Sequence, residues 1–199
     1  DVFIQQPTLK PIFNTIADVK SANHAGSSSI DMNLPDGFEI KVNSYSQVGL
    51  GASSLIRDIS EDNVGLGGTD WLDNGAINGK LLVFAPSGEA YSMKPSDGGF
   101  ITVYQAGAHT SNSSANNGLA LQAILNSNYH LDARLRSRYG SEGSIDFNSQ
   151  ISNTKQGKIF LGNVGQYESV LTYSGSGYAI HNQAAGCIFW NLKLTELGI

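Results

Sequence analysis

The strand pattern in the last third of the chain constrains the fold most. Residues 158–163 form a short apolar run that closes in a Gly-Asn turn, and residues 187–194 alternate apolar and polar side chains. A period of two bounded by glycine is typical of β-strands, because successive side chains point to opposite faces. Since the second run lies close to the last residue, we expect the chain to end inside its sheet and the fold to be complete at Ile199.

Similar short alternating segments occur along most of the chain. We predict strands at residues 29–34, 38–42, 53–59, 80–84, 89–93, 100–104, 119–125, 130–139, 145–151, 159–161, 169–173, 178–181 and 187–194. The run at 119–125 also fits a helix, but we interpret it as a strand. Turn formers separate the segments roughly every ten residues, which is typical of an antiparallel sandwich or jelly roll.

The predicted fold class is therefore all-β, an antiparallel β-sandwich. We expect an irregular N-terminal arm at residues 1–27 and a single sandwich domain at residues 28–199. No internal repeat of fixed period is visible, which argues against a propeller or a solenoid. The first residue is Asp1, so we expect the chain to be processed or excised from a longer one.

Charge and composition exclude several classes of function. The net charge of −5 argues against nucleic-acid binding, which requires clustered Lys and Arg. Three alternating arginines at 134, 136 and 138 form the only basic cluster, either a solvated strand face or a stripe that binds an acidic sugar or phosphate. No apolar run approaches the length of a membrane span. The single Cys187 cannot form an internal disulfide, and we predict a buried, inert thiol.

Three parts of the chain resemble the concanavalin A-like jelly roll in its laminin-G-like form. They are residues 38–42 after a Pro-Asp-Gly corner, the central runs at 79–83 and 98–104, and the closing pair at 159–163 and 185–194. The resemblance implies a jelly-roll sandwich over most of residues 28–197. Laminin-G-like domains often pair the closing cysteine with a second one, and Cys187 has no such partner.

The chain also resembles the receptor-binding tips of bacteriophage tail fibres and comparable trimeric adhesins. It is rich in Gly, Ser and Asn and poor in charge, and residues 62–67 resemble a phrase common in phage fibre proteins. This resemblance implies a virion-surface or extracellular location and a homotrimer. It also implies a glycan or cell-surface polysaccharide as the partner.

An acidic loop at residues 60–79 offers oxygen ligands of the kind that Ca²⁺ requires. The predicted metal ligands are Glu61, Asp62, Asp70 and Asp73. The strict calcium-loop pattern is absent, and the alternative is that these residues are turn formers and helix caps. The sequence leaves both interpretations open.

Two polar segments are candidates for sugar binding. Trp71 lies among Asp70, Asp73 and Asn74, where its ring could stack on a sugar while the polar side chains bind hydroxyls. The alternative is that Trp71 folds back as a cap on the core. The loop at 107–118 adds His109, Asn112 and Asn117, which would otherwise be solvated loop residues.

Motifs of hydrolases, zinc or iron sites and phosphate-binding loops are missing from the sequence. Our leading hypothesis is thus a non-enzymatic carbohydrate-binding, lectin-like or receptor-binding module. The alternative is a structural or assembly domain that binds no glycan. A third hypothesis is a glycan-cleaving enzyme that pairs Asp132 or Glu142 with Asp146.

Phe189 and Trp190 are neighbours in a predicted strand and therefore point to opposite faces. We expect one of them to contact a second surface, such as another subunit.

Overall fold

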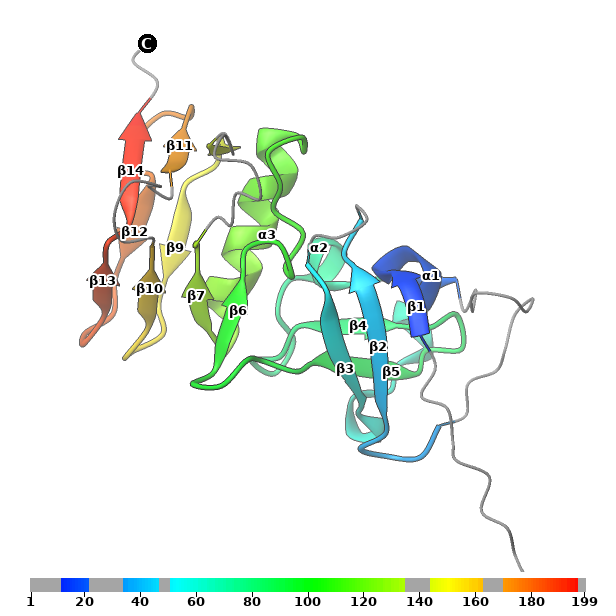
Figure 1. Ribbon diagram of the computed structural model, residues 1–199. Helices are drawn as coiled ribbons and strands as arrows, with labels where there is room; N and C mark the ends of the chain where they lie inside the picture. The colour runs from blue at the N-terminus through cyan, green and yellow to red at the C-terminus, as the bar shows by residue number, and fades with distance from the viewer. Residues whose placement is uncertain (1–11, 22–33, 47–50, 135–143, 163–169, 197–199) are drawn as a thin grey trace, which may run out of the picture.

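The computed structural model describes residues 12–21, 34–46, 51–134, 144–162 and 170–196. These residues form two parts that lie side by side, a mixed β-sheet and a stack of parallel strands (Figure 1). Most of the predicted strand at 29–34 and the ends of the predicted N-terminal arm lie outside the described residues, as do Arg136, Arg138 and Glu142.

The first part is a five-stranded sheet in the order β1-β2-β3-β5-β4. Its strands are β1 (Ile12–Thr15), β2 (Glu39–Ser44), β3 (Ser53–Arg57), β4 (Leu82–Phe84) and β5 (Ala90–Met93). β1 runs parallel to β2, and the other neighbours pair antiparallel. Alternate side chains of β2 and β3 are buried, as a period of two predicts. Four of the predicted strands are confirmed in this sheet.

The described part of the predicted N-terminal arm belongs to the packed core. The short helix α1 (Ile16–Lys20) follows β1 directly and begins at Thr15, which forms a capping box with Asp18. Phe13 on β1 and Ile16 and Val19 on α1 are fully buried.

The loop predicted at 60–79 contains three short helical turns. They are the 3₁₀ turns η1 (Ile59–Glu61) and η2 (Val64–Leu66) and the helix α2 (Trp71–Asn74). The side chain of Asn63 accepts a hydrogen bond from the Gly65 amide at 3.0 Å, and Asp70 caps α2 in the same way. Short polar side chains therefore begin these turns.

The second part is a solenoid of parallel strands. One sheet has the order β13-β10-β7-β6, a second β14-β11-β8 and a third β12-β9. The strands are β6 (Phe100–Thr102), β7 (His130–Asp132), β8 (Ile145–Phe147), β9 (Ile151–Asn153), β10 (Ile159–Leu161), β11 (Val170–Tyr173), β12 (Ile180–Asn182), β13 (Ile188–Trp190) and β14 (Lys193–Glu196). Each neighbouring pair within these sheets is parallel.

The prediction of an antiparallel sandwich, and with it the jelly-roll fold, is wrong. The argument against a solenoid is also wrong, because Ile101, Leu131, Phe160 and Phe189 align across β6, β7, β10 and β13. These positions are about 30 residues apart, a period typical of solenoids. The repeat is one of geometry: an inward position requires only an apolar side chain, so its residue type changes from turn to turn.

The run at 119–125 is part of a helix, α3 (Ser114–Asn126), and its interpretation as a strand is wrong. Ser113 caps the helix by accepting a hydrogen bond from the Asn116 amide at 3.2 Å. Ala120, Leu121 and Ile124 are fully buried, at the spacing of one helix face. The cap at Ser113 is the local signal that favours the helix.

Helix α3 packs against β7, β8 and β9 and covers one end of the solenoid (Figure 1). Gln122 takes the place of a neighbouring strand there. Its side-chain amide donates to the Ser152 carbonyl at 2.9 Å, and its side-chain oxygen accepts from the Ser152 amide at 2.8 Å. Among the described residues, no helix has the length and apolar character needed to cross a membrane.

Candidate functional site

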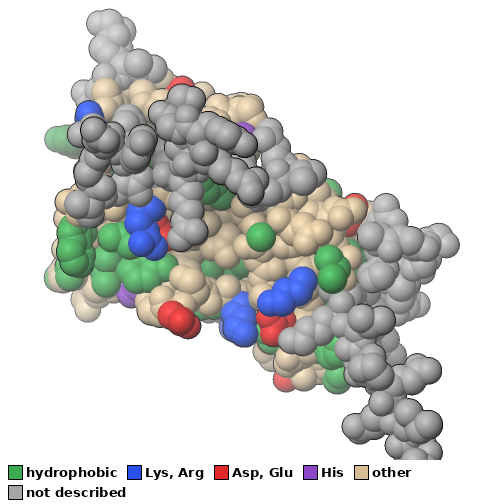
Figure 2. All heavy atoms as spheres, in the orientation of Figure 1, with side chains coloured by type: hydrophobic (Ala, Val, Ile, Leu, Met, Phe, Trp, Pro, Cys, Tyr) green, Lys and Arg blue, Asp and Glu red, His purple; other side chains and the backbone are tan. Residues whose placement is uncertain are grey.

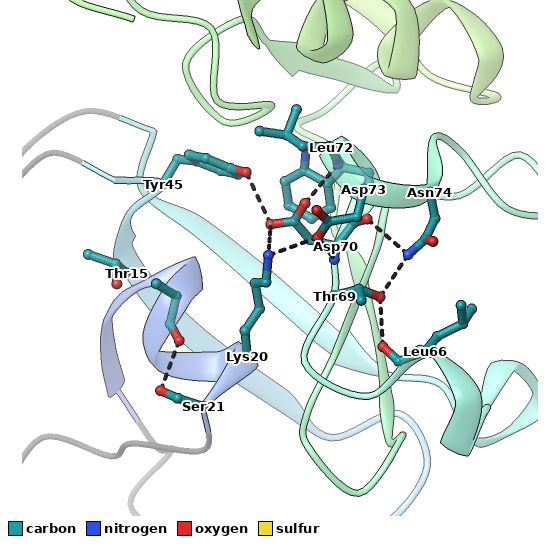
Figure 3. Close-up of polar contacts among 12 residues, drawn as sticks. Thr15, Lys20, Ser21, Tyr45, Leu66, Thr69, Asp70, Leu72, Asp73 and Asn74 are labelled. Carbon is teal, nitrogen blue, oxygen red and sulfur yellow. Dashed lines mark hydrogen bonds and ion pairs between the residues drawn. The ribbon is translucent and has the colours of Figure 1, made fainter.

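Asp70 is the centre of a polar junction between the N-terminal helix, the end of β2 and α2 (Figure 3). Its carboxylate accepts hydrogen bonds from the Tyr45 hydroxyl at 3.1 Å, the Lys20 ammonium at 3.2 Å and the Leu72 amide at 2.7 Å. Lys20 also donates to Asp73 at 2.9 Å. The Asp70 side chain is only 3% exposed, so these internal donors satisfy it.

The junction shifts the protonation of its members toward the paired forms. Burial is the largest single influence and acts against the charges of Lys20 and Asp73, but the hydrogen bonds and charges of the junction together outweigh it. The pKa of Lys20 is raised and that of Asp73 is lowered. Burial and the charge of Asp70 raise the pKa of the Tyr45 hydroxyl, which therefore stays protonated as a donor. The cluster is a stable ion-pair network at neutral pH.

Trp71 points into the core. It is 1% exposed, its ring nitrogen donates to the Ala106 carbonyl at 2.9 Å, and its ring centre lies 5.7 Å from that of Tyr45. Asn74 lies at the surface, and its side-chain amide donates to the Thr69 hydroxyl at 2.7 Å. Within the predicted group around Trp71, exposed side chains are therefore found at Asp73 and Asn74.

The second predicted group is tied to α3 and to β8. The Asn117 side chain accepts from the His109 amide at 2.8 Å and donates to the His109 carbonyl at 3.0 Å and the Asp146 carbonyl at 2.8 Å. Asn112 donates to the Gly107 carbonyl at 2.7 Å. Because Trp71 bonds Ala106, the structure brings the two predicted groups together at the boundary between the mixed sheet and the solenoid.

The four predicted metal ligands separate into different ion pairs. Asp62 holds the Arg57 guanidinium through two contacts at 2.5 and 2.6 Å, which lowers the pKa of Asp62 and raises that of Arg57. Glu61 pairs with Lys80 at 3.1 Å, whereas Asp70 and Asp73 pair with Lys20. No group of three His, Cys, Asp or Glu side chains in the described part of the chain is placed to hold a metal ion.

The carboxylates considered for catalysis lie on different sheets. Asp132 on β7 accepts two hydrogen bonds from the Arg134 guanidinium, at 2.9 and 2.6 Å, and its side chain is nearly buried. Asp146 on β8 is exposed and accepts a hydrogen bond from the Ser144 hydroxyl at 2.6 Å. Asp132 is thus already neutralised by its neighbour.

The structure reveals an exposed apolar surface on the outside of the solenoid, which we call the outer strip. It consists of Ile159 and Leu161 on β10 and of Ile188 and Trp190 on β13. Ile188 is 53% exposed and Trp190 61% exposed. Figure 2 shows hydrophobic side chains gathered at the left of this face, over the row of strands that ends in β13. In the sequence, Ile188 and Trp190 are two positions apart and therefore point to the same face of a strand. That they form one surface with Ile159 and Leu161 is seen only from the strand order.

The opposite directions predicted for Phe189 and Trp190 are confirmed. Phe189 stacks on the buried Phe160 with ring centres 4.3 Å apart, so it belongs to the inward row, although it is 47% exposed because β13 is the last strand of its sheet. Trp190 points outward beside Leu161. Cys187 is half-buried, not buried as predicted, and its sulfur accepts a hydrogen bond from the Asn153 side chain at 3.2 Å.

No family model matches the chain, and no curated protein matches it. Solved structures of phage tailspike proteins are similar in fold. The Acinetobacter phage vB_ApiP_P1 tailspike has a TM-score of 0.56 and 17% identity, covering 95% of this chain and 30% of that chain. The enzymatically active domain of bacteriophage CBA120 tailspike protein 4 has a TM-score of 0.58 and 13% identity, covering 94% and 24%.

A further neighbour is full-length tailspike protein 2 of the Escherichia coli O157:H7 bacteriophage CAB120. Its TM-score is 0.55 at 16% identity, covering 91% of this chain and 20% of that chain. The chain thus spans less than a third of the length of each of these three tailspikes. These likenesses show the fold, a mixed sheet joined to a parallel solenoid, and they agree with the predicted phage-fibre resemblance. The laminin-G-like resemblance is not confirmed.

Proposed function

We propose that the chain is a segment of a tailspike-like receptor-binding protein on the virion surface, with a cell-surface polysaccharide as its partner. The observation that carries this proposal is the fold, which tailspike structures match over at least 91% of this chain. In this proposal the chain functions as a homo-oligomer, a trimer as the phage-fibre resemblance implies. The step from fold to function is our own, because one fold supports many functions.

The proposed contact with sugar hydroxyls is at the boundary between the two parts. Asp73 and Asn74 expose polar side chains there. Asp70 and Trp71 hold α2 beneath them, and His109, Asn112 and Asn117 hold the loop that leads into α3, which contacts α2. A rigid support of this kind lowers the entropy cost of binding a flexible polysaccharide.

Replacing Asn74 with alanine is expected to weaken polysaccharide binding roughly tenfold, because it removes an exposed amide from the proposed contact. The measurement is isothermal titration calorimetry, in which purified bacterial capsular and O-chain polysaccharides are titrated into each protein. Asn148→Ala is the matched control, since Asn148 is an exposed asparagine on the solenoid. Equal affinities of the two variants would contradict the proposed contact, and absence of binding by the unaltered chain would contradict the proposed function.

We propose binding without cleavage. One tailspike neighbour is described as enzymatically active, and this chain covers 24% of it. The Asp132 carboxylate is paired with Arg134, and Asp146 lies on another sheet. Within the described residues, these two carboxylates therefore do not form the pair that a glycosidase requires. Release of new reducing ends from the same polysaccharides would contradict this part of the proposal.

The alternative function is a structural or assembly segment that binds no glycan. The exposed outer strip favours it, since contiguous apolar patches of this kind mark protein interfaces. A chain that associates with itself and binds none of the polysaccharides would support this alternative.

A further inference from the structure

We propose that the outer strip is the surface through which copies of this chain pack side by side. The inference rests on the homo-oligomer of the proposed function and deepens it by naming the interface. It is carried by the contrast between the outward faces of the solenoid, by the regular spacing of the strip and by its lack of net charge.

The outward face of the β6-β7-β10-β13 sheet differs from those of the other two sheets. On it, Ile159 aligns with Ile188 and Leu161 aligns with Trp190. Most outward positions of the other sheets are polar: Asp146, Lys193 and Thr195 on one, where Thr172 is buried, and Ser152 and His181 on the other. Exposed apolar side chains also occur elsewhere, for example at Tyr178 and Leu119, but on this face four apolar side chains lie next to one another. Such a contiguous patch indicates a surface that is covered in the assembled protein.

The strip continues along the sheet toward β6. Phe100 and His130 pack with ring centres 5.1 Å apart, and the Ile159 amide donates to the His130 ring at 3.3 Å. Burial and the nearby charge of Lys158 lower the pKa of His130, which favours the neutral ring near pH 7. Phe100 and His130 thus extend the strip across β7 to β6, beside the paired Asp132 and Arg134.

Charge favours a second copy of the same chain as the occupant. The whole chain carries a net charge of −5, so identical surfaces repel each other unless they are neutral where they meet. On this sheet Asp132 lies between Thr102 and Leu161, and Arg134 neutralises it through the bidentate contact. A neutral face allows self-association despite the overall charge.

The spacing of the strip also fits another solenoid. Outward side chains repeat at the distance between neighbouring strands, about 4.8 Å, and a parallel copy placed alongside presents the same spacing. A stable interface buries about 800 Å² on each partner, so the strip would supply the apolar centre and the polar residues around it the rim. A trimer forms in this way when the strip of each copy faces a shared three-fold axis.

The test is sedimentation equilibrium of the full 199-residue chain together with its Trp190→Gln and Tyr178→Gln variants. Tyr178 is the matched control, because it is an aromatic residue of the solenoid that is 74% exposed and lies beside β12, on another sheet. We expect the unaltered chain and Tyr178→Gln to associate with equal constants, and Trp190→Gln to weaken association at least tenfold. Equal association of all three proteins would overturn the proposal, as would a chain that stays monomeric up to about 100 μM.

Tryptophan fluorescence of the unaltered chain is the second readout, and it does not depend on whether a substituted variant folds. Trp71 is 1% exposed and Trp190 is 61% exposed, so concentration-dependent changes in acrylamide quenching report mainly on Trp190. We expect quenching to fall as the oligomer forms. Unchanged quenching during association would place the interface elsewhere and overturn the proposal. Polysaccharide binding is measured in a separate experiment. A chain that associates with itself but binds no polysaccharide would contradict only the proposed function.

Discussion

Replacing Trp71 with alanine is expected to lower the free energy of unfolding by about 4 kcal/mol, in the range found when a buried large aromatic side chain is truncated. The cavity would open between α2 and the loop at Ala106, where Trp71 packs on Tyr45. The Ala106 carbonyl would also lose its donor. The measurement is urea unfolding followed by circular dichroism, with the midpoint and the slope analysed separately.

Trp71→Phe separates the two contributions. It retains most of the ring volume but leaves the Ala106 carbonyl without the indole N–H, so a smaller loss of about 1–2 kcal/mol is expected. If Trp71 instead turned outward to stack on a sugar, Trp71→Phe would weaken polysaccharide binding while stability stayed near that of the unaltered chain. That result would contradict a role confined to the core.

Replacing Lys158 with methionine is expected to cost about 3 kcal/mol of stability. The Lys158 side chain is buried at the start of β10, and its ammonium donates to the carbonyls of Ile124 at 2.9 Å and Ser127 at 2.7 Å, and to that of Tyr129. These carbonyls lie at the end of α3 and in the turn that leads into β7. Methionine fills a similar volume but offers no donor, and each buried carbonyl left unpaired costs about 1–3 kcal/mol.

Lys155→Met is the control for this substitution, since Lys155 is an exposed lysine of the same segment. Its replacement is expected to change stability by less than about 0.5 kcal/mol. Equal losses in the two variants would show that Lys158 does not stabilise the end of α3. Because α3 covers the solenoid at β7, β8 and β9, Lys158→Met should also increase hydrogen exchange in α3 before the mixed sheet is affected.

Lys158 should also make stability depend on pH. Burial, with a smaller contribution from the charge of Lys155, lowers the pKa of Lys158 from 10.5 to about 8. Between these values the unfolded chain binds more protons than the folded one, so stability rises with pH in that window. Below about pH 8 the cost of the buried ammonium is fully present.

The unaltered chain should therefore gain about 1–2 kcal/mol relative to Lys158→Met between about pH 8 and pH 10. The measurement is the difference between the two unfolding free energies at each pH, which cancels the titration of other groups. Parallel curves for the two proteins would contradict the lowered pKa.

The positions of most strands could be predicted from the sequence, because alternation of apolar and polar side chains is a local signal. The predicted strand at 159–161 coincides with β10, and those at 169–173 and 178–181 lie close to β11 and β12. The predicted strand at 187–194 is two strands, β13 and β14, which belong to different sheets. The corner between them is at Asn191, whose φ of 53° is uncommon outside glycine and turns the chain.

The candidate site was predictable only as a set of residue types. Asp70, Asp73 and Asn74 were recognised as turn formers and as possible ligands, and their capping hydrogen bonds follow from the first of these roles. The ion pair with Lys20 joins residues 50 positions apart, and no local pattern could have revealed it. The burial of Trp71 likewise depends on Ala106, 35 positions away.

The amino-acid sequence by itself determined most of the extended segments, the turns between them and the net negative charge, although it misassigned the helix at 119–125 as a strand. Only the tertiary structure decided which strands are neighbours and in which direction they pair. The physical reason is that a half-buried strand has the same period of two in a parallel and in an antiparallel sheet. Because strands about 30 residues apart stack in parallel, Ile188 and Trp190 lie beside Ile159 and Leu161 and form one exposed apolar surface with them.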